Sequence, residues 1–215
     1  MSASAGARKR LTIPLGLLLV LSLALCAAFV HFFVTRGRRS EDLPRLFPVP
    51  AFALTSEQGR PVTRADLEGF AWIADFVFTQ CGGTCPLMTQ KMARLAADLK
   101  GIEAIRFVSF DVDPDRDGVP ELAAYAKAAG ADPARWSFLR GEKSAIVSLA
   151  RDGFKLAVVD GDPKDPEPVL HSTRFVLVDA AGTIRGYYDS TDPEAMERLQ
   201  ADARRLAPGS RKGTR

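Results

Sequence analysis

The sequence predicts an α/β protein, a three-layer sandwich of helices on a sheet, preceded by one N-terminal transmembrane helix. Three observations predict it. The body alternates strand-like apolar runs with amphipathic helix-like runs. It closes with two strand-like runs around a Gly turn and a last helical pattern. Residues 11–34 form a separate uncharged apolar segment near the start.

The apolar segment is interpreted as a membrane anchor. LTIPLGLLLVLSLALCAAFVHFFV at 11–34 has no Asp, Glu, Lys or Arg, and it exceeds the roughly 20 residues that cross a bilayer. A cleaved secretory signal fits less well, because its apolar core spans only about 7–15 residues. Leu25 stands before Cys26 where a lipoprotein signal has a small residue, so Cys26 is expected to be a buried apolar thiol within the span.

Charge is distributed unevenly along the chain. Three basic residues at 8–10 and three at 36–39 flank the apolar segment, so charge bias alone does not orient it. These six leave 23 Lys and Arg against 26 Asp and Glu in the remainder. A mildly acidic body argues against a nucleic-acid partner and favours placing the domain on the outer side.

The chain is therefore divided into five parts. We expect a short basic arm at 1–10, the transmembrane anchor at 11–34, a Pro-rich tether at 35–50, one folded domain at 51–206, and a basic flexible tail at 207–215.

The elements of the domain follow from periodicity and capping signals. Residues 70–78, FAWIADFVF, are almost continuously apolar, which is typical of a strand buried on both faces. Residues 86–100 place two Met and two Leu on one helical face. The other expected elements are a hairpin of 51–55 with 61–62, a brief helix with Thr63 and Asp66 as capping box, a strand at 105–112, helices at 121–129 and 144–150, a strand at 154–159, a hairpin of 175–180 with 183–188, and a helix at 193–206.

This order is that of a thioredoxin-like sandwich, and it places Cys81 and Cys85 between a central strand and the helix that follows. Proline is favoured at the first helical position, so Pro86 is expected to start the helix and Cys85 to be its N-cap. A thiol there faces the positive end of the helix dipole, which favours thiolate. The Gly pair at 82–83 lets the turn bring the two sulfurs together.

Three interpretations of the cysteine pair remain open: a structural disulfide, a redox couple and part of a metal site. A disulfide closing so small a loop stabilises little. A redox couple fits the position at a helix start, although the spacing is one residue longer than C-x-x-C. A metal site needs a further ligand, and His171 is the one histidine outside the apolar segment. In such a fold the loop before the late strand packs beside the cysteines, and two thiolates with one imidazole suit copper, with Cu(I) favoured by soft sulfur.

The motifs FVFTQCGGTCPLM, SFDVDPDRDGVPELAAYA and LHSTRFVLVDAAGTIRGYYDS, in this order after one apolar span, resemble the Sco/SenC family of copper-binding, thioredoxin-fold assembly factors. The resemblance covers about 52–199 and implies that Cys81, Cys85 and His171 bind copper as Cu(I) and as Cu(II). It implies a metallochaperone that matures the binuclear copper centre of cytochrome c oxidase, by delivering copper or by keeping that site's cysteines reduced.

The resemblance also implies partners and a location. The partners would be a copper-receiving oxidase subunit or another copper protein, and another copper chaperone. A bacterial inner membrane, with the domain on the periplasmic or outer side, is favoured over the mitochondrial inner membrane. Gln80 stands where many members have His, and Leu170 where an Asp often precedes the ligand, which bears on the tuning of His171 rather than on the ligand set.

Other functional classes fit less well. The acidic run at 111–118 begins like a calcium loop from Asp113, but Ala124 stands where the bidentate Glu belongs. The Pro and the Thr or Ser that stand at fixed distances before a peroxidase cysteine of the peroxiredoxin type are absent, because Phe78 and Gly82 stand three residues before Cys81 and Cys85. Two hypotheses are therefore carried: a membrane-anchored copper metallochaperone, and a thiol-disulfide oxidoreductase with Cys81 and Cys85 as its redox pair.

Overall fold

The computed structural model describes residues 16, 24–27, 29, 42–157 and 172–209. The chain divides into two units, residues 1–42 and 43–215. Of the first unit, the described residues are helical at 16, 24–27 and 29. Within the described stretches no helix reaches the length and hydropathy of a bilayer crossing, and most of the anchor expected at 11–34 lies outside them.

The second unit is built on one seven-stranded mixed sheet with strand order β2-β1-β5-β4-β3-β6-β7. The central strands β5, β4 and β3 are parallel to one another, and every other pair in the sheet is antiparallel. The strands are β1 (Ala53–Ser56), β2 (Pro61–Thr63), β3 (Ala71–Val77), β4 (Ile105–Asp111), β5 (Trp136–Arg140), β6 (Arg174–Val178) and β7 (Ile184–Asp189).

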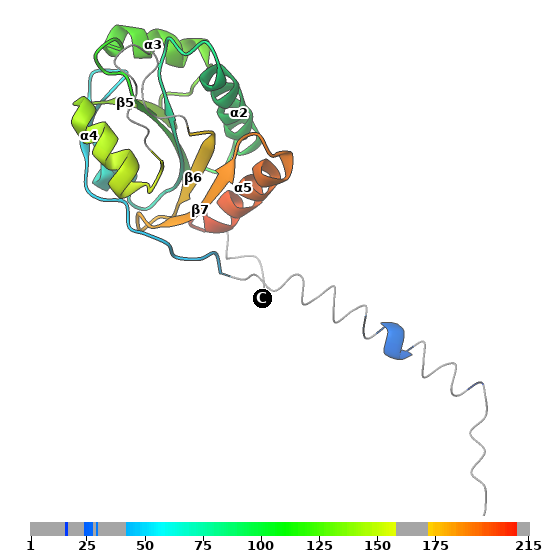
Figure 1. Ribbon diagram of the computed structural model, residues 1–215. Coiled ribbons are helices and arrows are strands. Elements are labelled where there is room, and N and C mark those ends of the chain that lie inside the picture. The colour runs from blue at the N-terminus through cyan, green and yellow to red at the C-terminus, as the bar shows by residue number, and fades with distance from the viewer. Residues whose placement is uncertain (1–15, 17–23, 28, 30–41, 158–171, 210–215) are drawn as a thin grey trace, which may run out of the picture. The chain divides into compact units, whose positions relative to one another are not determined.

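Helices cover both faces of this sheet, which confirms the predicted three-layer sandwich (Figure 1). They are α2 (Thr84–Asp98), α3 (Val119–Ala128), α4 (Lys143–Ser148) and α5 (Pro193–Leu206), with a π-helical turn (Leu149–Gly153) after α4. The capping box of Thr63 and Asp66 is present and opens a short 3-10 helix (Arg64–Leu67).

The core has an aromatic cluster on one face of the sheet. The Phe154 ring meets Trp72, Phe76 and Phe110 with ring centroids 5.3–6.0 Å apart. On the opposite face Phe138 stacks on Trp136 and packs against Tyr125 of α3. Alternate residues of a strand point to opposite faces, so the apolar strands of this sheet fill both layers.

The strand predicted at 154–159 is wrong for its described part, because residues 154–157 form no strand. Lys155 takes a positive φ of 53°, which breaks the extended path and leaves Phe154 pointing into the core. The strand that completes the parallel centre is β5, an element that the sequence did not predict. The hairpin of β6 with β7 and helix α5 are confirmed.

Residues 43–49 lie along the β7 edge, although the sequence suggested a tether there. The Leu46 N–H donates to the Ile184 carbonyl (2.9 Å), and the Ile184 N–H donates to the Phe47 carbonyl (2.8 Å). Arg185, buried and paired with Asp179 at 2.8 Å, also donates to the carbonyls of residues 43 and 44. This segment is therefore fixed to the domain by backbone and side-chain bonds.

Candidate metal and redox site

The cysteine loop and the acidic loop meet at one edge of the sheet. Strands β3 and β4 are parallel and in register from Ala71 with Ile105 to Val77 with Asp111, so both end at the same edge. The loop at 78–83 leaves β3 there, and the loop at 112–118 leaves β4 beside it. Ligand and catalytic groups of open α/β sheets gather at such carboxyl ends.

Helix α2 begins earlier than predicted. Its N-cap is Gly83 and its first residue is Thr84, so Cys85 lies inside the first turn and Pro86 follows it. The Cys85 N–H donates to the Cys81 sulfur at 3.4 Å. Because the first N–H groups of a helix have no partner within it, one of them is satisfied by a sulfur. The N–H group at the helix start is therefore directed at the Cys81 sulfur, and Cys85 is not the N-cap as predicted.

Cys85 itself is not a stabilised thiolate in this dithiol state. Its side chain is buried, and burial, followed by the neighbouring Cys81 and then by Asp75, raises the pKa of the Cys85 thiol to about 12. Cys81 is half-buried, and both cysteines are free. The pair thus consists of an accessible sulfur and a buried thiol, the arrangement of an attacking cysteine and a resolving cysteine.

Sequence reasoning missed Asp75, a charged residue inside the apolar strand β3. Asp75 is fully buried, and neither carboxylate oxygen has a hydrogen-bond partner among the described residues. Burial raises the pKa of Asp75 to about 7, a shift that nearby Ser109 opposes only in part. The signal was present in FAWIADFVF, where one acid interrupts an otherwise apolar run.

A second polar pair lies on the same side of the sheet. The Tyr125 hydroxyl of α3 and the Thr89 hydroxyl of α2 are hydrogen-bonded at 2.8 Å. Burial, and to a smaller extent Cys85 and Asp75, raise the pKa of Tyr125 to about 12. Tyr125 is therefore a neutral phenol close to the buried thiol.

The acidic loop is a folded part of this edge and not a calcium loop. The Asp117 carboxylate accepts from the Thr79 N–H at 2.7 Å and from the Thr79 hydroxyl. Asp113 pairs with Arg116, and Asp111 accepts from the Asp113 N–H at 3.0 Å. Burial raises the pKa of Asp111 to about 8. Across the described residues no three His, Cys, Asp or Glu side chains are grouped to hold a metal ion.

His171, the predicted third ligand, lies outside the described residues. The structure brings Cys81 and Cys85 together, and the described residues continue from Ser172. Strand β6 runs antiparallel to β3, with Ala74 opposite Val176. The start of β6 is therefore at the edge where β3 ends and where the cysteine loop begins.

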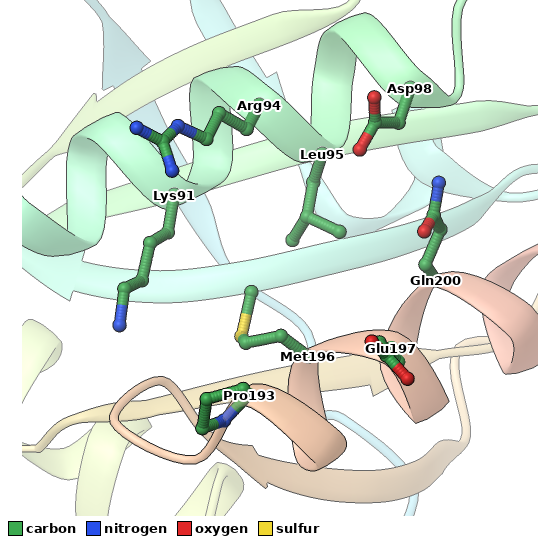
Figure 2. Close-up of a pocket in the computed structure, with 8 residues that line it drawn as sticks. All are labelled: Lys91, Arg94, Leu95, Asp98, Pro193, Met196, Glu197 and Gln200. Atoms are coloured by element: carbon green, nitrogen blue, oxygen red, sulfur yellow. The ribbon is translucent and has the colours of Figure 1, made fainter.

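A groove lies between α2 and α5 (Figure 2). Its volume is about 340 Å³, and its lining side chains point from both helices toward one another. It is lined by Lys91, Arg94, Leu95, Asp98, Pro193, Met196, Glu197 and Gln200. Two bases and two acids balance, and no cysteine takes part, so the groove has no charge preference that would identify a ligand.

Comparison with known proteins agrees with this arrangement. A family model described as SCO1/SenC matches residues 44–207. The chain is 30% identical over 178 residues to the SCO1 protein homolog of Bacillus subtilis (strain 168), which covers 82% of this chain and 91% of that protein.

Solved structures show the same fold. BsSco, described as a member of the Sco family of cytochrome c oxidase assembly proteins with a disulfide switch, is 29% identical with a TM-score of 0.69, and the match covers 79% of this chain and 98% of that one. Bradyrhizobium japonicum ScoI with copper bound is 20% identical with a TM-score of 0.62, covering 74% of this chain and 99% of that one. The thioredoxin-like fold is therefore shared across these proteins.

Proposed function

Because the chain belongs to the SCO1/SenC family, we propose that it is a membrane-anchored copper metallochaperone. Copper is its cargo, bound by Cys81, Cys85 and His171, and the recipient is the binuclear copper centre of cytochrome c oxidase. The observation that carries the proposal is that both cysteines lie at one partly open edge, where the Cys81 sulfur accepts the Cys85 N–H and the Cys81 side chain is near enough to the Cys85 thiol to raise its pKa.

The donor set fits copper by its chemistry. Two sulfurs select Cu(I), and one imidazole gives a third ligand that both oxidation states accept. Copper binding requires deprotonated sulfur, so the buried Cys85 thiol releases its proton as the metal enters. The helix start beside Cys81 and the metal charge both favour that release. The copper-bound Sco structure and the oxidase-assembly role given for BsSco support this assignment.

The location follows from the same proposal. Residues 11–34 anchor the chain in a bacterial inner membrane, and the domain is on the periplasmic or outer side. Its partners are a copper-receiving oxidase subunit and a protein that supplies copper. The uncharged length of the segment supports this anchor.

Copper binding by the full chain in detergent tests the metal site. The purified protein is loaded with Cu(I) and, separately, with Cu(II), and bound metal is counted after desalting. We expect one equivalent for the wild type and strong loss for Cys81→Ser, Cys85→Ser and His171→Ala. The chain has two histidines, so His31→Ala is the matched control and should bind as the wild type does. Retention unaffected by the three ligand variants would reject the site.

A second function, thiol-disulfide exchange, is favoured by the unequal exposure of the two free cysteines and by the disulfide switch described for BsSco. The Cys81 thiolate attacks one sulfur of a disulfide on the recipient, that S–S bond breaks, and the released sulfur takes a proton. Cys85 then loses its proton and attacks Cys81, which frees the second recipient thiol. The recipient disulfide gains two electrons, and the Cys81–Cys85 pair becomes a disulfide.

The two functions separate in cells. Copper-site assembly is measured as oxidase activity in strains carrying His171→Ala or Cys81→Ser. If copper delivery is the essential role, both strains should lose activity. If thiol reduction is essential, His171→Ala should retain activity while Cys81→Ser does not. Full activity in both strains would contradict both functions.

A further inference from the structure

We infer that Asp117 is a positioning residue for the cysteine pair, acting through Thr79. One carboxylate oxygen accepts the Thr79 N–H at 2.7 Å and the other accepts the Thr79 hydroxyl. These bonds join residues 38 positions apart in the sequence. Thr79, which donates both of them, lies two residues before Cys81. The inference rests on the proposed function only in treating Cys81 and Cys85 as the working pair.

We call the two hydrogen bonds from Thr79 to the Asp117 carboxylate the clamp. On the Asp117 side, this clamp is held by further hydrogen bonds. Asp117 is fully buried, and its N–H donates to the Asp113 carbonyl at 2.9 Å. Its own carbonyl accepts from the Arg140 Nε at 2.8 Å, and the same guanidinium donates to the Pro114 carbonyl at 2.8 Å. Because Arg140 ends β5, it joins the loop that carries Asp117 to the sheet, so the Asp117–Thr79 bonds connect the cysteine loop to the sheet through that loop.

The cysteine side has little other support. Gly82 and Gly83 are exposed, and a Cβ added to either would meet no atom within 4 Å. Between Thr79 and Cys85 the Cys81 sulfur accepts the Cys85 N–H, and the Cys81 side chain packs partly against the core. The loop is thus fixed at its start by Asp117 and at its end by α2, and the start sets where Cys81 lies.

The two hydrogen-bond donors of Thr79 require a carboxylate at position 117, because each donor needs its own acceptor oxygen. Thr79 presents two, its N–H and its hydroxyl, and Asp117 presents one acceptor oxygen to each. An Asn at 117 keeps the size but has one acceptor oxygen, and its amide group would face a donor. Loosening the clamp lowers the effective concentration of one cysteine beside the other. Disulfide formation within the pair should therefore become less favourable.

The test is the equilibrium of the Cys81–Cys85 pair with glutathione, measured without copper on the full chain in detergent. Asp117→Asn should lower the equilibrium constant for oxidation about tenfold, the equivalent of one buried hydrogen bond to a charged group. A tenfold change is 29.6 mV for a two-electron couple. Thr79→Val should lower this equilibrium constant by a similar factor, and combining it with Asp117→Asn should lower the constant little further. Thr79→Ser keeps both donors and should have the wild-type equilibrium constant.

Asp113→Asn is the matched control, because Asp113 is a buried acid of the same loop that does not contact Thr79. It should change the equilibrium constant less than twofold. If Asp117→Asn and Thr79→Val lower the free energy of unfolding but leave the equilibrium constant unchanged, Asp117 is merely structural and the inference fails. Should Asp117→Asn not fold, Thr79→Val decides alone. If the wild type does not bind copper, the proposed metal site is rejected, but the effect of Asp117→Asn on the thiol-disulfide equilibrium is still tested.

Discussion

Replacing Asp75 with Asn should remove a pH-dependent loss of stability from the folded domain. Asp75 is fully buried with no partner for either oxygen among the described residues, and burial raises its pKa from 3.8 to about 7. The folded state therefore holds this proton more tightly than the unfolded chain does. The stability that Asp75 contributes is full below pH 3.8, falls as pH rises, and is lost above about pH 7.

The magnitude follows from the shift. About three pKa units at 1.36 kcal/mol each set an upper value of about 4 kcal/mol. Relative to low pH, proton linkage at Asp75 lowers the free energy of unfolding by about 2 kcal/mol at pH 5 and by about 4 kcal/mol at pH 8. A buried Asn also lacks partners, and that cost does not change with pH. The stability of Asp75→Asn relative to the wild type should therefore rise by about 2–3 kcal/mol between pH 5 and pH 8.

Urea unfolding under reducing conditions at pH 5, 6, 7 and 8 measures this difference. The raised pKa of Asp111 is common to both proteins and cancels in the comparison. Asp66→Asn is the control, because hydrogen bonds from Thr63 lower the pKa of Asp66 and keep it ionised throughout this range. Its stability difference should be constant from pH 5 to pH 8. A constant difference for Asp75→Asn as well would refute the assignment of a protonated Asp75.

Three other substitutions test the packing and the bonds described above. Phe154→Ala should lower the free energy of unfolding by about 3–5 kcal/mol, since it removes a fully buried ring from the aromatic cluster; thermal or urea unfolding measures it, and a loss below 1 kcal/mol would contradict the packing. Trp136→Phe should cost about 1–2 kcal/mol, because the indole N–H donates to the buried Ser109 hydroxyl at 3.0 Å; an unchanged midpoint would show that water replaces this bond. Arg185→Met should lower the free energy of unfolding by about 1–3 kcal/mol and release residues 43–44 from the domain. Limited proteolysis would detect the release as faster cleavage at these residues. Equal cleavage rates would show that the backbone bonds to β7 are enough to hold the segment.

The fold was predictable where a single local rule governs an element. Strand β3 was readable because a strand buried on both faces is apolar throughout. Helix α5 begins at Pro193 with Asp192 as its N-cap, and its predicted bounds are confirmed. Strand β5 was missed because its five residues, WSFLR, are too short and too mixed to stand out. Its identity comes from pairing with β4, a contact that no local pattern contains.

The nearness of the two cysteines was predictable, but their electrostatics were not. The C-x-x-x-C spacing before a helix indicated that Cys81 and Cys85 lie together, and in the structure the Cys81 sulfur accepts the Cys85 N–H and influences the Cys85 thiol. Which sulfur the helix favours depends on where the first turn begins, and Pro86 misplaced that start by two residues. The role of His171 as a ligand stays a prediction. Burial of Asp75 required the whole sheet and its covering helices.

The segment at 43–49 also affects how the domain avoids self-association. An outer strand with free N–H and C=O groups is a template for pairing with another chain. Here the Leu46 N–H and the Phe47 carbonyl form hydrogen bonds with the carbonyl and N–H of Ile184, at the start of the outer strand β7. The outer strand at the opposite edge, β2, is three residues long and begins with Pro61. A soluble fragment beginning at residue 51 would uncover the β7 edge and should aggregate, whereas one beginning at residue 43 keeps it covered and should stay monomeric.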